Sequence, residues 1–127
     1  MQKKTIATAA FIGMLSVILG AFAAHGLKKI LPIEQVIIFE TGVKYQMYHA
    51  LFLLLIGLIP LTEKKLKIIY NLTIFGIFLF SGSIYLLTTK AISGIDFKFI
   101  GILTPIGGML LIMAWGVLML NFLQKKE

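Results

Sequence analysis

His49 is the residue of this sequence with the clearest chemical potential. Tyr45 precedes it by four residues, so the two side chains lie on one face if the segment is helical. Histidine exchanges protons near neutral pH, and tyrosine can pass them on. Both side chains also serve as packed hydrogen-bonding groups, which is the commoner role of a single histidine in a membrane helix. Proton handling and packing are therefore both open for this pair.

Few other groups in the sequence are suited to catalysis or metal binding. The chain has no cysteine, which excludes disulfides, zinc–thiolate sites, iron–sulfur clusters and thiol catalysis. Asp96 is the only aspartate and falls in a predicted loop. His25 and His49 fall on different predicted spans and would need carboxylates to complete a metal site. We expect no metal site and no cofactor, and an enzyme is the least favoured class of function.

The composition is that of a membrane protein. The 127 residues are 59% hydrophobic and 13% charged, with a mean hydropathy of +0.99. A soluble domain carries about a quarter charged residues, and this length fits about four spans of roughly 20 residues. The net charge of +7 comes from lysines at the ends of apolar segments. This pattern is typical of contacts with lipid headgroups, so we expect membrane lipids as partners and no nucleic acid.

The fold class predicted is all-α: an integral membrane four-helix bundle with an additional interfacial helix between spans one and two. The whole chain, 1–127, forms a single transmembrane domain. The predicted spans are about 5–24, 43–62, 68–88 and 99–122. The interfacial helix is predicted over about 32–41, beginning near Pro32 and bending near Gly42 into span two. Span one is expected to be retained, because its apolar run exceeds the 7–15 residues of a signal-peptide core.

The second span is the informative one because its uninterrupted apolar run covers only positions 50–61. Crossing a hydrocarbon core of about 30 Å takes around 20 residues. Glu63 and the lysines after it fix one end in water, so the span must begin near Val43. Four polar residues must then enter the membrane: Tyr45, Gln46, Tyr48 and His49. The same rise per residue puts His49 about 10 Å below the outer interface.

With this threading, polar residues from all four spans gather in one layer of the outer half. The layer comprises His25, Tyr45, Gln46, Tyr48, His49, Ser81, Ser83, Tyr85 and Thr104. Polar side chains at this depth are costly unless they pair inside the bundle or line a wet cavity. The layer is therefore either a pocket for a headgroup, a quinone-like ring or a proton, or a hydrogen-bonded clamp that fixes helix packing. Clamps of this kind are the more common arrangement.

Span one carries small residues on one face. They recur at spacings of three and four and are Ala9, Gly13, Ser16, Gly20 and Ala24. Small residues let a neighbouring helix approach closely, so this face predicts helix packing and is also available for a homo-oligomer.

Other residues are expected to have structural roles. Glu40 and Lys44 are spaced for an ion pair at the entry to span two. Pro105, close to Gly108 in the first half of span four, removes one backbone donor and predicts a kink or a wetted carbonyl. Trp115 lies too deep for an interfacial aromatic belt. It is therefore expected to pack against another helix, with an acceptor for its N–H group.

The lysine distribution favours an orientation with both termini inside. Seven lysines then lie in inner segments and five in outer segments. Lysine is enriched in cytoplasmic segments, so the N- and C-termini are expected to be cytoplasmic.

Four motifs in order resemble one family along essentially the whole chain. Residues 20–27, GAFAAHGL, are similar to its GAFGAHGL signature and depart from it at Ala23. Residues 45–51 match YQMYHAL, and 81–86 resemble its GSLYLL element. Residues 104–108, TPIGG, followed by Trp115, are similar to its ending. The chain thus resembles the YgdD/YwdK-like family of small bacterial inner-membrane proteins, a domain of unknown function. The resemblance implies a multi-pass plasma-membrane protein and no assigned activity.

Two functions from different classes follow. The first is a non-enzymatic membrane protein that binds lipid or a small amphipathic molecule, or scaffolds a membrane complex. The alternative is a minimal proton or solute transporter or channel component that uses His49 and requires oligomerisation.

Overall fold

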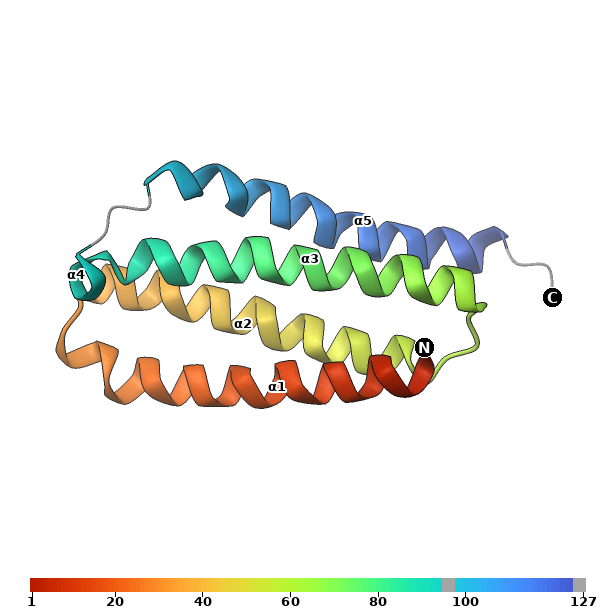
Figure 1. Cartoon of the computed structure of the whole chain (residues 1–127), viewed down its shortest axis with the longest axis horizontal. Helices are drawn as coiled ribbons and strands as arrows, with labels where there is room; N and C mark the ends of the chain where they lie inside the picture. Colours follow the sequence, from red (N-terminus) through yellow and green to blue (C-terminus); the bar gives the residue numbers. More distant parts are fainter. Residues whose placement is uncertain (95–97, 125–127) are drawn as a thin grey trace.

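The computed structural model describes residues 1–94 and 98–124, and this part of the chain is almost entirely helical. Four long helices lie side by side (Figure 1): α1 Gln2–His25, α2 Ile33–Ile56, α3 Glu63–Thr88 and α5 Leu103–Gln124. Short helices accompany them: the 3-10 helices Leu27–Lys29 and Lys98–Ile102, and α4 Lys90–Ser93. The predicted all-α fold with four long helices is confirmed.

The helices alternate in direction, so the bundle has two distinct ends. The start of α1, the α2–α3 connection and the end of α5 share one end, called here the terminal end. The α1–α2 connection, α4 and the start of α5 share the other, the distal end (Figure 1). Three continuous helical stretches, residues 2–29, 63–88 and 99–124, are long and apolar enough to cross a membrane. The α2 helix has 24 residues, as α1 does, but its first half carries two glutamates and a lysine.

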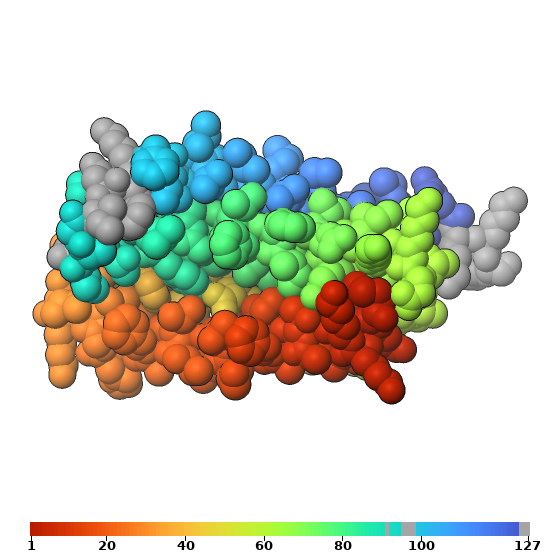
Figure 2. Space-filling view, viewed as in Figure 1, coloured from red at the N-terminus to blue at the C-terminus, as the bar shows by residue number. Residues whose placement is uncertain are grey.

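Contacts between α1 and α2 recur every seven residues. The facing pairs are Ile6 with Gly57, Gly13 with Ala50, and Gly20 with Val43. A methyl group built on Gly13 would lie 3.8 Å from the Ala50 Cβ atom, which is ordinary van der Waals contact. A seven-residue repeat keeps one seam of each helix against its partner in an antiparallel, coiled-coil-like pair. In the view of Figure 2, the middle of α2 is visible only in a narrow gap between α1 and α3.

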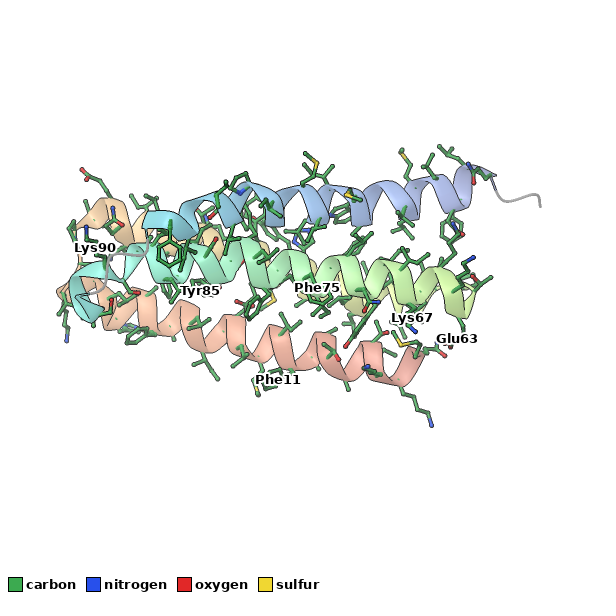
Figure 3. All side chains as sticks on the ribbon, turned by 45° about the horizontal axis from the view of Figure 1, so that its top comes forward. Phe11, Glu63, Lys67, Phe75, Tyr85 and Lys90 are labelled. Atoms are coloured by element: carbon green, nitrogen blue, oxygen red, sulfur yellow. The ribbon has the colours of Figure 1, made fainter. Side chains whose placement is uncertain are left out.

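Four of the five small residues predicted on one face of α1 lie in this seam, whereas Ala24 is exposed and its neighbour Ala23 is buried instead. Ala9 and Ser16 are each only 2% exposed, and Gly13 and Gly20 lie over α2. Within one chain, α2 therefore covers the face that was expected to be available for a homo-oligomer, and self-association itself stays a prediction. The outward face of α1 carries large apolar residues instead, such as Phe11, which projects from the bundle in Figure 3.

The α3 and α5 helices pack still more closely. Their facing pairs are Gly76 with Leu111, Phe80 with Gly107, and Ser83 with Thr104. From one pair to the next, the residue number rises by four and then three on α3 and falls by four and then three on α5. This spacing is again that of an antiparallel seam with a seven-residue repeat. A methyl group on Gly107 would overlap the backbone nitrogen of Phe80. The two backbones can approach this closely only because position 107 has no side chain.

The predicted separate interfacial helix over 32–41 is not present, because α2 runs without interruption from Ile33 to Ile56. Gly42 allows α3 to approach α2 closely and does not mark a bend. A methyl group at this position would lie 3.0 Å from side-chain atoms of Ile84 and Tyr85 on α3. The helix also ends six residues before the predicted boundary at position 62, since Gly57 caps it and Pro60 follows.

Pro105, predicted to give a kink or a wetted carbonyl in the first half of span four, lies in the first turn of α5. It is the third residue of α5, directly after the 3-10 helix Lys98–Ile102. The first turn of a helix does not need its backbone donors, so the missing N–H group disturbs no helical hydrogen bond there.

Two glycines of α5 provide a matched test of the α3–α5 seam. We expect Gly107→Ala to destabilise the protein by about 1–3 kcal/mol, because a methyl group must push the Phe80 backbone away. Gly116→Ala should leave stability unchanged or slightly raised, because nothing lies within 4 Å of the added methyl and alanine favours helix. Unfolding in detergent measures both, and equal stability of the two variants would contradict the seam.

Candidate functional site

Gln46 joins three helices through one side chain. Its amide nitrogen donates to the Ile12 carbonyl of α1 at 3.0 Å, and its amide oxygen accepts from the Tyr85 hydroxyl of α3 at 2.5 Å. The residue is 5% exposed. In an apolar environment an unpaired amide is costly, so these two bonds fix how α1, α2 and α3 lie against one another.

Two serines of α3 make further contacts between helices. The Ser81 hydroxyl donates to the Gly42 carbonyl of α2 at 2.7 Å. The Ser83 hydroxyl donates to the Phe80 carbonyl at 3.0 Å and lies 2.5 Å from the Thr104 hydroxyl. A hydroxyl has one proton to give, so Thr104 is the donor in that second contact. Each serine thus connects α3 to a different neighbour, α2 or α5.

His49 connects α2 to α5. Its Nδ1 atom lies 2.7 Å from the Tyr45 carbonyl oxygen, which can only accept, so Nδ1 carries the proton. Its Nε2 atom accepts from the Trp115 indole nitrogen at 3.0 Å. The ring is therefore neutral in this arrangement, with both nitrogens bonded. The acceptor that Trp115 was expected to need is His49, although the indole is 48% exposed and lies at the surface of the bundle.

Aromatic rings surround this hydrogen bond. The Phe52 and Trp115 rings lie 4.2 Å apart, and Tyr45 stacks on His49 at 6.4 Å. The Phe80 ring of α3 lies 5.0 Å from Tyr45. Together these rings form a continuous aromatic cluster that runs from α3 through α2 to α5.

A groove of about 320 Å³ runs between α2 and α5 over α3. Its lining residues are Tyr45, His49, Phe80, Gly108, Leu111, Ile112 and Trp115. The α5 helix packs along α3, while the His49–Trp115 bond joins it to α2 across the groove. Ile112 and Trp115 are both exposed, so the groove opens to the side of the bundle and not only at its end.

The polar residues predicted from the sequence divide into two groups. Gln46, His49, Ser81, Ser83, Tyr85 and Thr104 form the contacts between helices, and Tyr45 lines the groove. His25 ends α1 with an exposed side chain, and Tyr48 is 54% exposed on the outside of α2. Figure 3 shows Tyr85 towards the distal end of α3 and Glu63 at its terminal end.

Among the described residues, no three acidic, histidine or cysteine side chains are grouped to hold a metal.

The expected ion pair between Glu40 and Lys44 does not form. Both residues are described, and no nitrogen and oxygen of the two approach within 4.0 Å. Lys44 is exposed on the outer side of α2, turned away from the contact seams.

Sequence reasoning missed several residues of the site. Phe52 could have been found, because it continues the helical face of Tyr45 and His49 by one more turn. Ile112 comes from α5, which is apolar on nearly every side, so periodicity does not mark one face. Phe80 ends the continuous apolar run 74–80 of α3, where no polar residue marks which side faces a neighbour. The Ile12 carbonyl carries no sequence signal at all, since any backbone position has one.

A double-mutant cycle tests whether Gln46 and Tyr85 are coupled. Gln46→Leu and Tyr85→Phe each remove one side of the bond, so the pair should lose less stability than the sum of the single variants. Hydrogen bonds between membrane helices couple by about 0.6 kcal/mol on average and up to about 1.7. Unfolding in detergent measures the coupling energy.

Tyr70→Phe is the matched control for that cycle. Tyr70 also lies on α3 and bonds through its hydroxyl to Thr8 at 3.1 Å, without touching Gln46. Its combination with Gln46→Leu should be additive. Additive behaviour of the Gln46 and Tyr85 pair as well would show that their bond carries no energy.

Comparison with known proteins gives one family. Residues 19–108 match the family model described as a protein of unknown function, DUF423. A UPF0382 membrane protein of Staphylococcus saprophyticus is 40% identical over 94% of this chain and 97% of its own length. A UPF0382 membrane protein of Haemophilus influenzae is 38% identical over 91% of this chain and 90% of its own.

The UPF0382 membrane protein YwdK of Bacillus subtilis is also 38% identical, over 90% of this chain and 91% of its own length. No solved structure matches the chain. The predicted resemblance to YwdK-like proteins is confirmed, and the relatives are named as membrane proteins.

Proposed function

Starting from the membership of this chain in the DUF423 family of membrane proteins of unknown function, we propose that it binds the hydrocarbon chain of an amphipathic lipid. The site is the groove between α2 and α5, and the protein carries out no catalysis. The observation that carries this proposal is the sideways opening of an aromatic-lined groove in a bundle whose buried polar side chains, within the described residues, are already paired.

The size and lining of the groove support a single hydrocarbon chain. Its volume of about 320 Å³ lies at the lower end of ligand pockets, which run from about 300 to 1,000 Å³. Phe80, Leu111 and Ile112 give it an apolar floor and wall. In a bilayer this side of the bundle faces lipid, so an acyl chain reaches the groove without crossing water.

The placement in the membrane that goes with this proposal has four crossings. The α2 helix runs beside α1 from Ile6 to Gly20, so it spans the same layer despite the charged residues of its first half. Ala50 of α2 faces Gly13 of α1, and the two helices are antiparallel. His49, one residue earlier on α2, is therefore level with position 14 of α1. At 1.5 Å per residue, that is about 15 Å inside position 24, close to the middle of the bilayer.

The orientation that we propose puts the terminal end in the cytoplasm of a bacterial cell, with the chain in the plasma membrane. The start of α1, the α2–α3 connection and the end of α5 share that end. In the sequence, the segments that precede the first predicted span, join the second to the third and follow the fourth hold seven lysines, against five elsewhere in the chain. Positively charged residues favour the cytoplasmic side, and they attract anionic headgroups there.

A transport role through His49 has less support. Both ring nitrogens are bonded, and Nε2 can accept a proton only after the Trp115 indole moves away. A relay built on this residue would have to break the contact between α2 and α5 in every cycle.

Filling the groove tests lipid binding. Ile112 lines the groove and is 65% exposed, so Ile112→Trp can enter the open volume without displacing the core. We expect this variant to retain several-fold less lipid through purification, as native mass spectrometry would record.

Met109→Trp is the matched control on the same helix. Met109 is 57% exposed and does not line the groove, so the tryptophan side chain of this variant is added outside the site. Lipid retention that is equal in the two variants would contradict the proposed site.

Single introduced cysteines test the orientation, because the chain has no cysteine to give a background. We expect Lys28→Cys, at the distal end, to react with an impermeant maleimide added to intact cells or spheroplasts. Lys64→Cys, at the terminal end, should react only after the membrane is opened. The reverse pattern would place the terminal end outside.

A further inference from the structure

Lys44 holds an unusual position for a lysine in a membrane helix. Its neighbour Val43 faces Gly20 of α1, so Lys44 is level with position 19. With the apolar stretch of α1 in the hydrocarbon, that level lies about 7 Å inside the membrane from position 24. The side chain is exposed, and Lys44 has no ion-pair partner within the described part of the chain. A charge at this depth is costly unless it reaches the interface or meets an anion.

The helix geometry directs Lys44 towards the distal interface. Side chains on a helix lean towards its N-terminus, and α2 has its N-terminus at the distal end. A lysine stem spans roughly one helical turn, so the ammonium group can rise towards the headgroups while the stem stays on apolar surface. It therefore ends at the depth where lipid phosphates meet the acyl chains.

The surface beside Lys44 supplies the other half of a lipid site. The next residue, Tyr45, forms the distal end of the groove together with Phe80 and Gly108. Tyr45 and Tyr48 are 41% and 54% exposed, with their rings 5.6 Å apart. The Tyr45 hydroxyl has no hydrogen-bond partner among the described residues. One cation and one exposed tyrosine, Tyr45, thus lie at the distal mouth of an apolar groove.

We propose that Lys44 binds the phosphate of an anionic phospholipid whose acyl chain occupies the groove between α2 and α5. This inference rests on the proposed function and assigns the headgroup class. Charge complementarity favours a lipid of net negative charge over a zwitterionic one, because a zwitterion brings its own cation to the phosphate. Tyr45, the next residue along α2, lies where it can donate a hydrogen bond to the same headgroup.

Lipid competition tests this assignment. The full-length protein is purified from nanodiscs that contain equal amounts of phosphatidylglycerol and phosphatidylethanolamine, and the bound lipids are counted by native mass spectrometry. We expect Lys44→Gln to lower the preference for phosphatidylglycerol by about fivefold, since one lysine near a membrane surface contributes that much attraction. The total number of bound lipids should change little, because the groove is intact.

Two further variants complete the comparison. Lys28→Gln removes an exposed lysine from the 3-10 helix after α1, away from the groove, and should leave the preference unchanged. Lys44→Arg keeps the charge and should keep the preference. An equal preference in Lys44→Gln and Lys28→Gln would overturn the headgroup site, and so would loss of both lipids in equal proportion.

The outcome separates this inference from the proposed function. If Ile112→Trp reduces total lipid while Lys44→Gln leaves the ratio unchanged, the groove binds a chain and Lys44 is not its headgroup site. If Ile112→Trp retains as much lipid as Met109→Trp, the groove itself is refuted, and the assignment of Lys44 falls with it.

Discussion

The arrangement of this bundle depends on the need to pair a buried amide in an apolar environment. Gln46 meets that need with a carbonyl of α1 and a hydroxyl of α3, so three helices are fixed by one side chain. The apolar core divides around it, with one cluster about Leu53 and Ile69 towards the terminal end and another about Leu27 and Phe39 towards the distal end. Dispersion contacts supply the bulk of the packing, and the amide sets its register.

The groove is a result of how α5 joins the other three helices. Close approach at Gly107 holds α5 against α3, and its link to α2 passes through the His49–Trp115 bond. Had α5 packed on α2 along its length, the space over Phe80 would be filled by side chains. A single polar bridge keeps the two helices joined and leaves apolar volume beside it. The hydrogen bonds between helices and the groove are thus neighbouring parts of one arrangement.

The sequence predicted the architecture well because hydropathy and length set it. Four long helices follow from composition, and the short apolar run after His49 predicts that Gln46 enters the membrane, where the bundle buries it. The continuity of α2 could not be predicted, because a glycine such as Gly42 can mark a bend or a close approach with the same local sequence. The groove lining was equally hidden, since Ile112 lies on a helix that is apolar on every face.

The seam between α1 and α2 has a consequence for changes in length. Ile6, Gly13 and Gly20 meet their partners at intervals of one full repeat, so inserting a single residue between them would turn the following part of α1 by about 100°. Ile12 and Leu19 would then take the places of Gly13 and Gly20 against α2, where the available gap accepts only hydrogen atoms or methyl groups. Insertions are tolerable in the connection after Lys29, while the helices themselves tolerate them only in whole repeats.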